Sequence, residues 1–475
     1  MISNLRKDLL EVLATAWPLM LATGLFSITL FVDRSLLYRY SDSAASAALG
    51  AGTILWSINC LPIGICGYTS TFVAQYLGVK RPERALQVVW QGVLLSLIFG
   101  PMLLLMGVFA EPFFLWIGHA PHLADQEAAY LFWLIPGTWA IIVASALVGL
   151  FAGSGRTMIL LYADFVVTIV NGVLDYVLIF GMFGIPSLGV RGAAIASSIA
   201  LILKLVILGV VASRDFRWRN NLIREPNVSS PLPPTYNRSE VRNLLKWDWP
   251  LMKRLVHFGW PAGVSVVAEA WSFTIIMMLV GRLGDQAAAA TTLALNVNLI
   301  AFIPLVGLGT AVGVLVGKYL VQDQISKAKR IVRSGLLIGI AYSLIFVVLY
   351  GGFPDWVMTI YALDADPERF DAMRPILRPL LLFVASYCVF DAFQTVFVGA
   401  LKGAGDTRFV LGGHLFAGTL AVTSGITLNQ LGWEGLYFWW SVITAWVILL
   451  AVIFTGRYLQ GGWQNKRVIE PPVVE

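Results

Sequence analysis

The chain has 475 residues, of which 58% are hydrophobic and 13% are charged, and its mean hydropathy is +0.77. A soluble globular domain carries about 25% charged residues, so these values exclude a soluble globule. We attribute the net charge of +6 to basic loops on one side of a membrane, because cytoplasmic loops are enriched in Lys and Arg. The sequence therefore predicts an all-α polytopic membrane protein without a nucleic-acid partner.

Twelve apolar segments are long enough to span a bilayer, which takes about 20 residues. We predict spans at 9–37, 44–78, 86–110, 129–152, 158–182, 189–212, 252–281, 287–320, 331–352, 376–401, 409–431 and 435–457. Six spans precede a polar, basic segment and six follow it. The predicted domains are an N-lobe (1–213), a cytoplasmic linker (214–254), a C-lobe (255–458) and a cytoplasmic tail (459–475).

The two halves of the chain repeat. Pro18 and Pro261 have the same separation in sequence as Tyr76 and Tyr319. Six spans in each half give both copies the same orientation, as parallel repeats. We expect two pseudo-symmetric six-helix lobes around a central cleft. We expect the protein in the inner membrane of a bacterium. Both termini are expected in the cytoplasm, since this orientation places most Lys and Arg on the cytoplasmic side.

Prolines lie inside the first span of each half, at Pro18 and Pro261. A proline inside a helix frees a carbonyl group and kinks the helix. In lipid such a kink is tolerated only where protein or cavity water satisfies the freed group. We therefore expect a helix kink at both positions.

Acidic residues at membrane depth are the main functional signal of the sequence. Each costs roughly 2.5–3.5 kcal/mol at the centre of a spanning helix, and such residues persist where they face a cavity, bind a cation or carry protons. The alternative explanation is structural: an acid of this kind can be hydrogen-bonded to a neighbouring helix. This alternative suits Asp164 best, because Asp164 lies near the end of its span. The acids in question are Asp33, Asp164, Asp175, Glu269 and Asp391.

Two of these acids have a polar partner one helical turn away. Asn171 and Asp175 are four residues apart, as are Tyr387 and Asp391, so the members of each pair share one helix face. Amide oxygen, phenol and carboxylate at this spacing suit a hard monovalent cation or a proton relay.

Several motifs together are typical of a known family. They are P-x14-D (Pro18 to Asp33), P-x7-E (Pro261 to Glu269), D-x2-Q (Asp391, Gln394) before LKGAGDT (401–407), and FAGSGRT (151–157) before NGVLDYVLIFG. Through these motifs the sequence resembles the multidrug and toxic compound extrusion (MATE) family of cation-coupled antiporters. The resemblance runs from about residue 9 to 457.

The resemblance implies two cation or proton sites. Asp33, Asn171 and Asp175 would form an N-lobe site, and Glu269, Tyr387 and Asp391 a C-lobe site. One position departs from the family pattern, since Thr29 stands one turn before Asp33 where some relatives have tyrosine. The coupling ion, Na⁺ or H⁺, stays open, and we expect neither another cofactor nor another metal.

The expected function is export of organic, cationic or amphiphilic compounds by alternating access, without enzymatic activity. The expected partners are small organic substrates and membrane lipids, and the protein is expected to be a monomer. A lipid-linked oligosaccharide flippase of the same superfamily is the main alternative. Such a flippase would need several basic residues within its spans to hold pyrophosphate. The basic residues at these positions are Lys204 and arginines at helix ends.

Two other features of the sequence, a GAGD segment and a histidine inside a span, have structural explanations. GAGD (403–406) resembles a motif of intramembrane aspartyl proteases, with Asp391 as partner, but its counterpart GSGR (153–156) lacks the Asp. We interpret both as tight turns. His414 lies inside a span and is expected to be a packed, hydrogen-bonded histidine, with a proton carrier as the alternative. A channel or receptor would differ from an antiporter in lacking stoichiometric dependence on a counter-ion.

Overall fold

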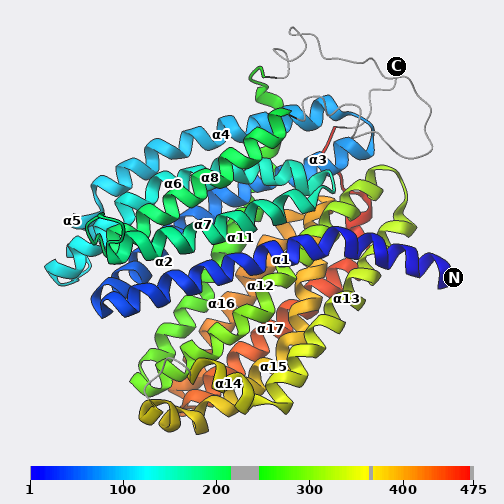
Figure 1. Cartoon of the computed structure of the whole chain (residues 1–475). Helices are drawn as coiled ribbons and strands as arrows, with labels where there is room; N and C mark the ends of the chain where they lie inside the picture. Colours follow the sequence, from blue (N-terminus) through cyan, green and yellow to red (C-terminus); the bar gives the residue numbers. More distant parts are fainter. Residues whose placement is uncertain (1, 215–244, 363–366, 471–475) are drawn as a thin grey trace. The chain divides into compact units, whose positions relative to one another are not determined.

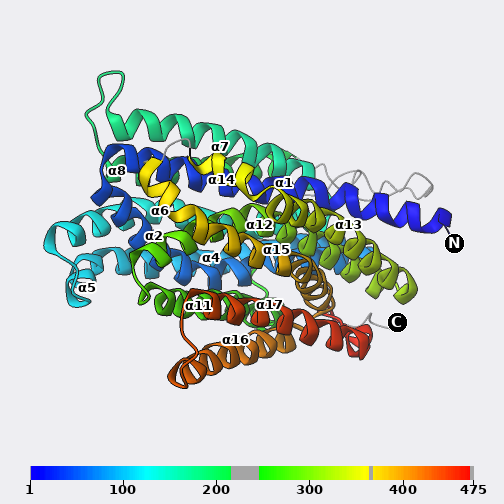
Figure 2. The same ribbon diagram turned by 90° about the horizontal axis from the view of Figure 1, so that it is seen from below.

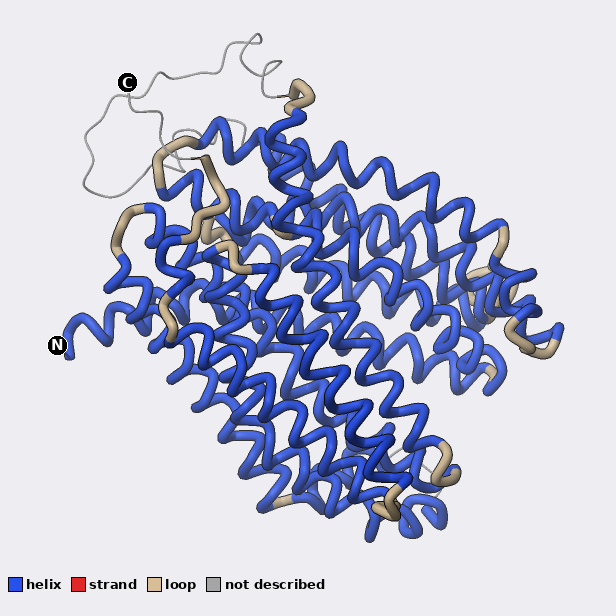
Figure 3. Tube along the Cα trace, turned by 180° about the vertical axis from the view of Figure 1, so that it is seen from behind, coloured by secondary structure: helices blue, strands red, loops and turns tan. Residues whose placement is uncertain are grey.

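The computed structural model describes residues 2–214, 245–362 and 367–470. Within these ranges all regular secondary structure is helical (Figure 3). The helices are α1 (Ile2–Tyr40), α2 (Asp42–Gly67), α3 (Thr69–Gly78), α4 (Pro82–Val108), α5 (Ala110–Trp116), α6 (Pro121–Gly153), α7 (Thr157–Phe180), α8 (Val190–Arg214), α11 (Trp249–Gly281), α12 (Asp285–Val321), α13 (Ile325–Gly352), α14 (Pro354–Ala362), α15 (Pro367–Ala404), α16 (Thr407–Gln430), α17 (Leu436–Leu459) and the 3₁₀ turn η2 (Gly462–Asn465).

Twelve spans in the described ranges are long and apolar enough to cross a membrane, which confirms the predicted all-α, twelve-span membrane protein. Two short helices, α5 and α14, were not predicted. Each follows the third span of its half and is too short for its periodicity to be recognised. The second predicted span comprises two helices, α2 and α3, that meet at Tyr68.

The break between α2 and α3 coincides with hydrogen bonds of the Thr69 side chain. The Thr69 hydroxyl lies 2.9 Å from the carbonyl oxygen of Cys66 and 3.2 Å from that of Ala146. A threonine hydroxyl that bonds the backbone competes with the regular helical ladder. The same side chain therefore ends one helix and ties the next to α6.

By their internal contacts the described residues form two compact units. Unit 1 holds the residues up to Thr23 and those from Ser265 to Arg467, and unit 2 holds Gly24 to Val264 and the residues from Val468 onward. The division falls inside α1 and α11, a few residues after Pro18 and Pro261. Both helices continue through their prolines. The predicted division into an N-lobe, a linker and a C-lobe stays a prediction, and most of the predicted linker lies outside the described residues.

In unit 2, α6 is the central helix and packs against α2, α3, α4 and α8 (Figure 1). One face of α2 is lined by small buried residues, among them Ala44, Ala47 and Ala51. Larger side chains such as Phe114 and Ile142 complete this core. Small residues let helix backbones approach closely where lipid provides no hydrophobic driving force between helices.

In unit 1, α15 takes the equivalent place and packs against α12, α13 and α17, while α16 lies beside α17 (Figure 2). The contact with α12 is very close. A Cβ atom at Gly399 would lie 2.1 Å from the carbonyl oxygen of Gly309, and one at Gly403 would lie 2.1 Å from that of Gly313. Two small-xxx-small motifs thus face each other, and they fix the helix that carries Tyr387 and Asp391.

Candidate functional site

Unit 2 contains the first acidic cluster, which we define as Asp33 on α1 with Asn171 and Asp175 on α7. All three side chains are buried. Asp33 and Asp175 lie close enough for their charges to interact, and Asn171 is one turn from Asp175 on the same helix. The structure therefore brings together two acids that are far apart in sequence.

Several oxygens of the first acidic cluster are buried and, among the described residues, have no hydrogen-bond partner. They are Asp33 Oδ1, Asn171 Oδ1 and both carboxyl oxygens of Asp175. The Asn171 amide nitrogen donates to Ser197 Oγ at 3.3 Å, which leaves its carbonyl oxygen as an acceptor. Buried charge without a partner is costly, and carboxylate and amide oxygens are ligands that hard cations prefer. The residues thus fit a bound Na⁺ or bound protons equally well.

Two further side chains adjoin the first acidic cluster. Tyr130 on α6 is buried and lies within electrostatic reach of both Asp33 and Asp175. Thr29, the position that departs from the family pattern, lies 3.0 Å from Thr168 through its hydroxyl and so ties α1 to α7. Sequence reasoning missed Tyr130, because one aromatic among many apolar residues carries no signal.

Unit 1 contains the second acidic cluster, which we define as Glu269 on α11 with Tyr387 and Asp391 on α15. Tyr387 and Asp391 are buried, whereas the Glu269 side chain is 32% exposed. Glu269 and Asp391 lie within electrostatic reach of each other. The amide of Gln394 donates to Glu269 Oε1 at 2.9 Å, so the glutamine of the D-x2-Q motif orients the carboxylate.

Two basic residues face Glu269 from other positions. His414 on α16 is buried and hydrogen-bonded as expected, but its Nε2 also lies 3.4 Å from Glu269 Oε2. Lys402, in the last turn of α15, acts electrostatically on the same carboxylate. Sequence reasoning missed both partnerships. The signal that could have found the first was a lone histidine at membrane depth.

The remaining acid at membrane depth, Asp164, has a structural explanation. Its carboxylate forms an ion pair with Lys204 on α8. Each charge neutralises the other, and the pair joins α7 to α8. Asp164 therefore lies outside the first acidic cluster, as its position near the end of the span suggested.

The GAGD segment is a tight turn, as predicted. Gly405 has φ +99°, a left-handed conformation that favours glycine. The buried Asp406 accepts a hydrogen bond from Arg457 Nε at 2.8 Å and forms an ion pair with Lys466. Asp391 interacts instead with Glu269, so the two aspartates serve different clusters.

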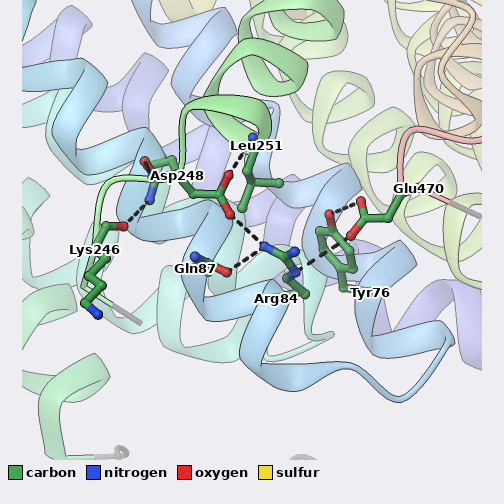
Figure 4. A network of polar contacts seen from close by, with 8 residues as sticks. Tyr76, Arg84, Gln87, Lys246, Asp248, Leu251 and Glu470 are labelled. Carbon is green, nitrogen blue, oxygen red and sulfur yellow. Dashed lines mark hydrogen bonds and ion pairs between the residues drawn. The ribbon is translucent and has the colours of Figure 1, made fainter. Parts of the chain in front are cut away.

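A third polar cluster lies in unit 2 where the described chain resumes after the linker (Figure 4). Arg84 on α4 donates to Asp248 at 2.7 Å, and its Nε lies 3.7 Å from Glu470 Oε1. Tyr76 donates to Glu470 Oε2 at 2.8 Å, and Asp248 Oδ1 accepts from the Leu251 amide at the start of α11. Arg84 thus joins three chain segments, which is a structural role.

Comparison with known proteins gives consistent results. The MatE family model matches residues 18–177 and 261–422. Among curated proteins, the chain is similar to a probable multidrug resistance protein NorM of Bradyrhizobium diazoefficiens, with 28% identity over 86% of this chain and 84% of that protein. It is also similar to one from Shewanella oneidensis, with 25% identity over 96% of both chains.

Solved structures show the same fold. A eukaryotic MATE transporter, AtDTX14, superimposes with a TM-score of 0.80 at 18% identity, covering 97% of each chain. A transporter of the MOP superfamily from Pyrococcus furiosus gives a TM-score of 0.82 at 17% identity, also covering 97% of each chain. Since the family model matches both halves and most of the chain, this protein belongs to the multidrug and toxic compound extrusion family.

Proposed function

We propose that the protein exports organic cations in exchange for Na⁺ or H⁺, by alternating access. The observation that carries the proposal is the presence of one acidic cluster in each unit, with Asp33 and Asp175 buried in unit 2 and Asp391 buried in unit 1. Each cluster joins a helix that passes from one unit to the other, α1 or α11, to a helix within a unit, α7 or α15. Proton or cation binding there can favour one conformation only if the two conformations bind the ion differently.

The coupling energy is adequate for such an exchange. Moving one elementary charge through 100 mV yields about 2.3 kcal/mol. At 1.36 kcal/mol per factor of ten, one ion sustains a substrate gradient of roughly fifty-fold. The names of the curated relatives, multidrug resistance protein NorM, support small organic molecules as substrates.

A lipid-linked oligosaccharide flippase is the alternative function, and it requires unpaired basic residues at membrane depth. The Pyrococcus furiosus transporter is described as having a binding pocket of reverse polarity, which suggests a different function for that protein. Here the membrane-embedded Lys204 is paired with Asp164, and the clusters described above are acidic. Charge therefore favours a cationic substrate. The proposal also includes a monomeric protein in a bacterial inner membrane with both termini in the cytoplasm, the orientation that places most Lys and Arg inside.

The test is uptake of ethidium, a fluorescent organic cation, into everted vesicles under a pH gradient or a Na⁺ gradient imposed separately. We expect one gradient to drive uptake. Asp33→Asn, Asp175→Asn, Glu269→Gln and Asp391→Asn should each reduce the rate at least tenfold. Asp125→Asn is the matched control, because this aspartate is exposed on the surface.

The outcomes separate the candidate functions. If neither gradient changed the rate of ethidium uptake, the antiport proposal would be overturned and the flippase favoured. Transport of lipid-linked substrates would then be measured. Uptake that survives all four substitutions would show that the acidic clusters do not couple transport. A reduction by Asp125→Asn equal to that of the cluster variants would point to lost expression, so protein levels are measured in parallel.

A further inference from the structure

We propose that His414 and Glu269 together hold the coupling proton, so that the second acidic cluster takes H⁺ and not Na⁺. This inference rests on the proposed antiport function and names its ion. It assigns a transport role to His414, for which the sequence favours a packed residue and leaves a proton carrier as the alternative.

The hydrogen bonds of the imidazole ring carry the argument. His414 Nδ1 lies 2.9 Å from the carbonyl oxygen of Val410. A carbonyl oxygen can only accept, so Nδ1 must carry a hydrogen. The other ring nitrogen, Nε2, faces Glu269 Oε2 at 3.4 Å. If the ring were neutral, Nε2 would be an acceptor facing a second acceptor.

A proton must therefore lie between His414 and Glu269. It is either on Nε2, giving an imidazolium beside a carboxylate, or on the carboxyl group, which then donates to Nε2. Both forms contain one proton more than a neutral histidine and an ionised glutamate. The position of the proton between the two atoms does not alter this count.

The surroundings keep the pair in place. From α17 the ring of Phe454 covers the imidazole, with ring centroids 4.9 Å apart. From α15, Gln394 holds the other oxygen of Glu269 at 2.9 Å, while Asp391 and Lys402 act electrostatically on Glu269. Arg457, the charged residue at the end of α17, is held by Asp406. A second carboxyl group, Asp391, and an amine, Lys402, thus lie close to the pair that shares the proton.

Release of this proton would change the contact between the two helices. Two acceptors, Nε2 and an ionised carboxylate, would then face each other at 3.4 Å, and the carboxylate would have lost its nearest positive charge. The released proton passes to water. The side chain of Glu269 would turn toward Lys402 or toward a cationic substrate, and proton loss and substrate binding would thereby be linked.

The first experiment detects the pair without transport. The chain has four histidines, so ¹⁵N-histidine NMR of the full-length protein in nanodiscs can assign His414 by its absence in His414→Gln. We expect a signal protonated at Nδ1. In Glu269→Gln the Nε2 signal should change, because the ring has lost the carboxyl group with which it shares the proton. An Nε2 signal that is unchanged in Glu269→Gln would overturn the proposal.

The second experiment uses proteoliposomes, ethidium and the two gradients. In wild type we expect the pH gradient to drive transport and a Na⁺ gradient alone to have no effect. His414→Gln should transport at least tenfold more slowly at pH 7.5 and recover to within threefold at pH 5.5, where Glu269 can take up a proton unaided. His122→Gln, on an exposed residue, is the control.

The results distinguish this inference from the proposed function. Transport driven by Na⁺ alone would overturn the proton proposal and leave antiport intact. A His414→Gln pH profile that follows wild type would also overturn it. If neither gradient drove transport in wild type, the proposed function would fail, and the NMR comparison of wild type with Glu269→Gln would still decide whether the pair shares a proton.

Discussion

Asp406 provides a stability prediction whose magnitude follows from the structure. Its side chain is 1% exposed and binds two partners, Arg457 (23% exposed) and Lys466 (41% exposed). A hydrogen bond to a charged group contributes about 1.5–3 kcal/mol, but the exposed part of each partner regains hydration when the pair is broken. Asp406→Asn keeps one acceptor oxygen. We therefore expect it to lower the free energy of unfolding by about 2 kcal/mol, and Asp406→Ala by about 3 kcal/mol.

The measurement is reversible unfolding of the purified protein in mixed micelles with increasing denaturing detergent. Asp355→Asn is the matched control, because Asp355 binds Arg374 in a pair that is 51% and 50% exposed. Exposed ion pairs contribute about 0.2–1 kcal/mol, so this change should cost less than about 0.5 kcal/mol. The reasoning is refuted if Asp406→Asn costs no more than the control.

Three further predictions use the same unfolding assay or proteolysis. Gly399→Ala and Gly403→Ala should each lower the free energy of unfolding by about 1–3 kcal/mol, because the added Cβ would lie 2.1 Å from a carbonyl oxygen of α12. The control, Gly412→Ala, has open space around it and should be neutral. Equal losses in all three variants would contradict the close helix contact. Lys204→Met should lower the free energy of unfolding by about 3–5 kcal/mol, because it leaves the charge of Asp164 uncompensated. Adding Asp164→Leu to this variant should restore most of the lost stability. Additive losses in the double variant would show that the pair does not act as a unit. Arg84→Ala should speed limited proteolysis near residue 245, since Arg84 holds Asp248 and lies near Glu470; Arg81→Ala, from the loop before α4, is the control, and equal rates would argue against the anchoring role.

Hydrophobic length predicted the fold well because a bilayer imposes one length on every spanning helix. Short helices such as α5 and α14 escape this constraint, and so they were missed. The break at Tyr68 was also missed, since it depends on a hydrogen bond from Thr69 to Ala146 on another helix. Contacts between distant segments leave no trace in local periodicity.

The acidic residues were recognisable because each is costly in lipid and therefore needs a reason. Their partners were harder to find. Asp164 and Lys204 each stood out in the sequence, but the pairing of α7 with α8 is needed to join them. His414 could be read as a packed residue until its second nitrogen was seen to face Glu269.

The repeated scaffold and its charges do not follow the same symmetry. Asp164 and His414 lie the same number of residues after the first residue of their helices, α7 and α16, so they are equivalent positions of the two halves. Asp164 pairs with a lysine on α8, whereas His414 pairs with Glu269 on α11. The first acidic cluster uses α7, but the second uses α15, the counterpart of α6. Because the two clusters occupy non-equivalent positions, they are not two copies of one site. Substitutions in them should therefore alter ion dependence in different ways, with pH sensitivity concentrated in the second acidic cluster, where His414 faces Glu269.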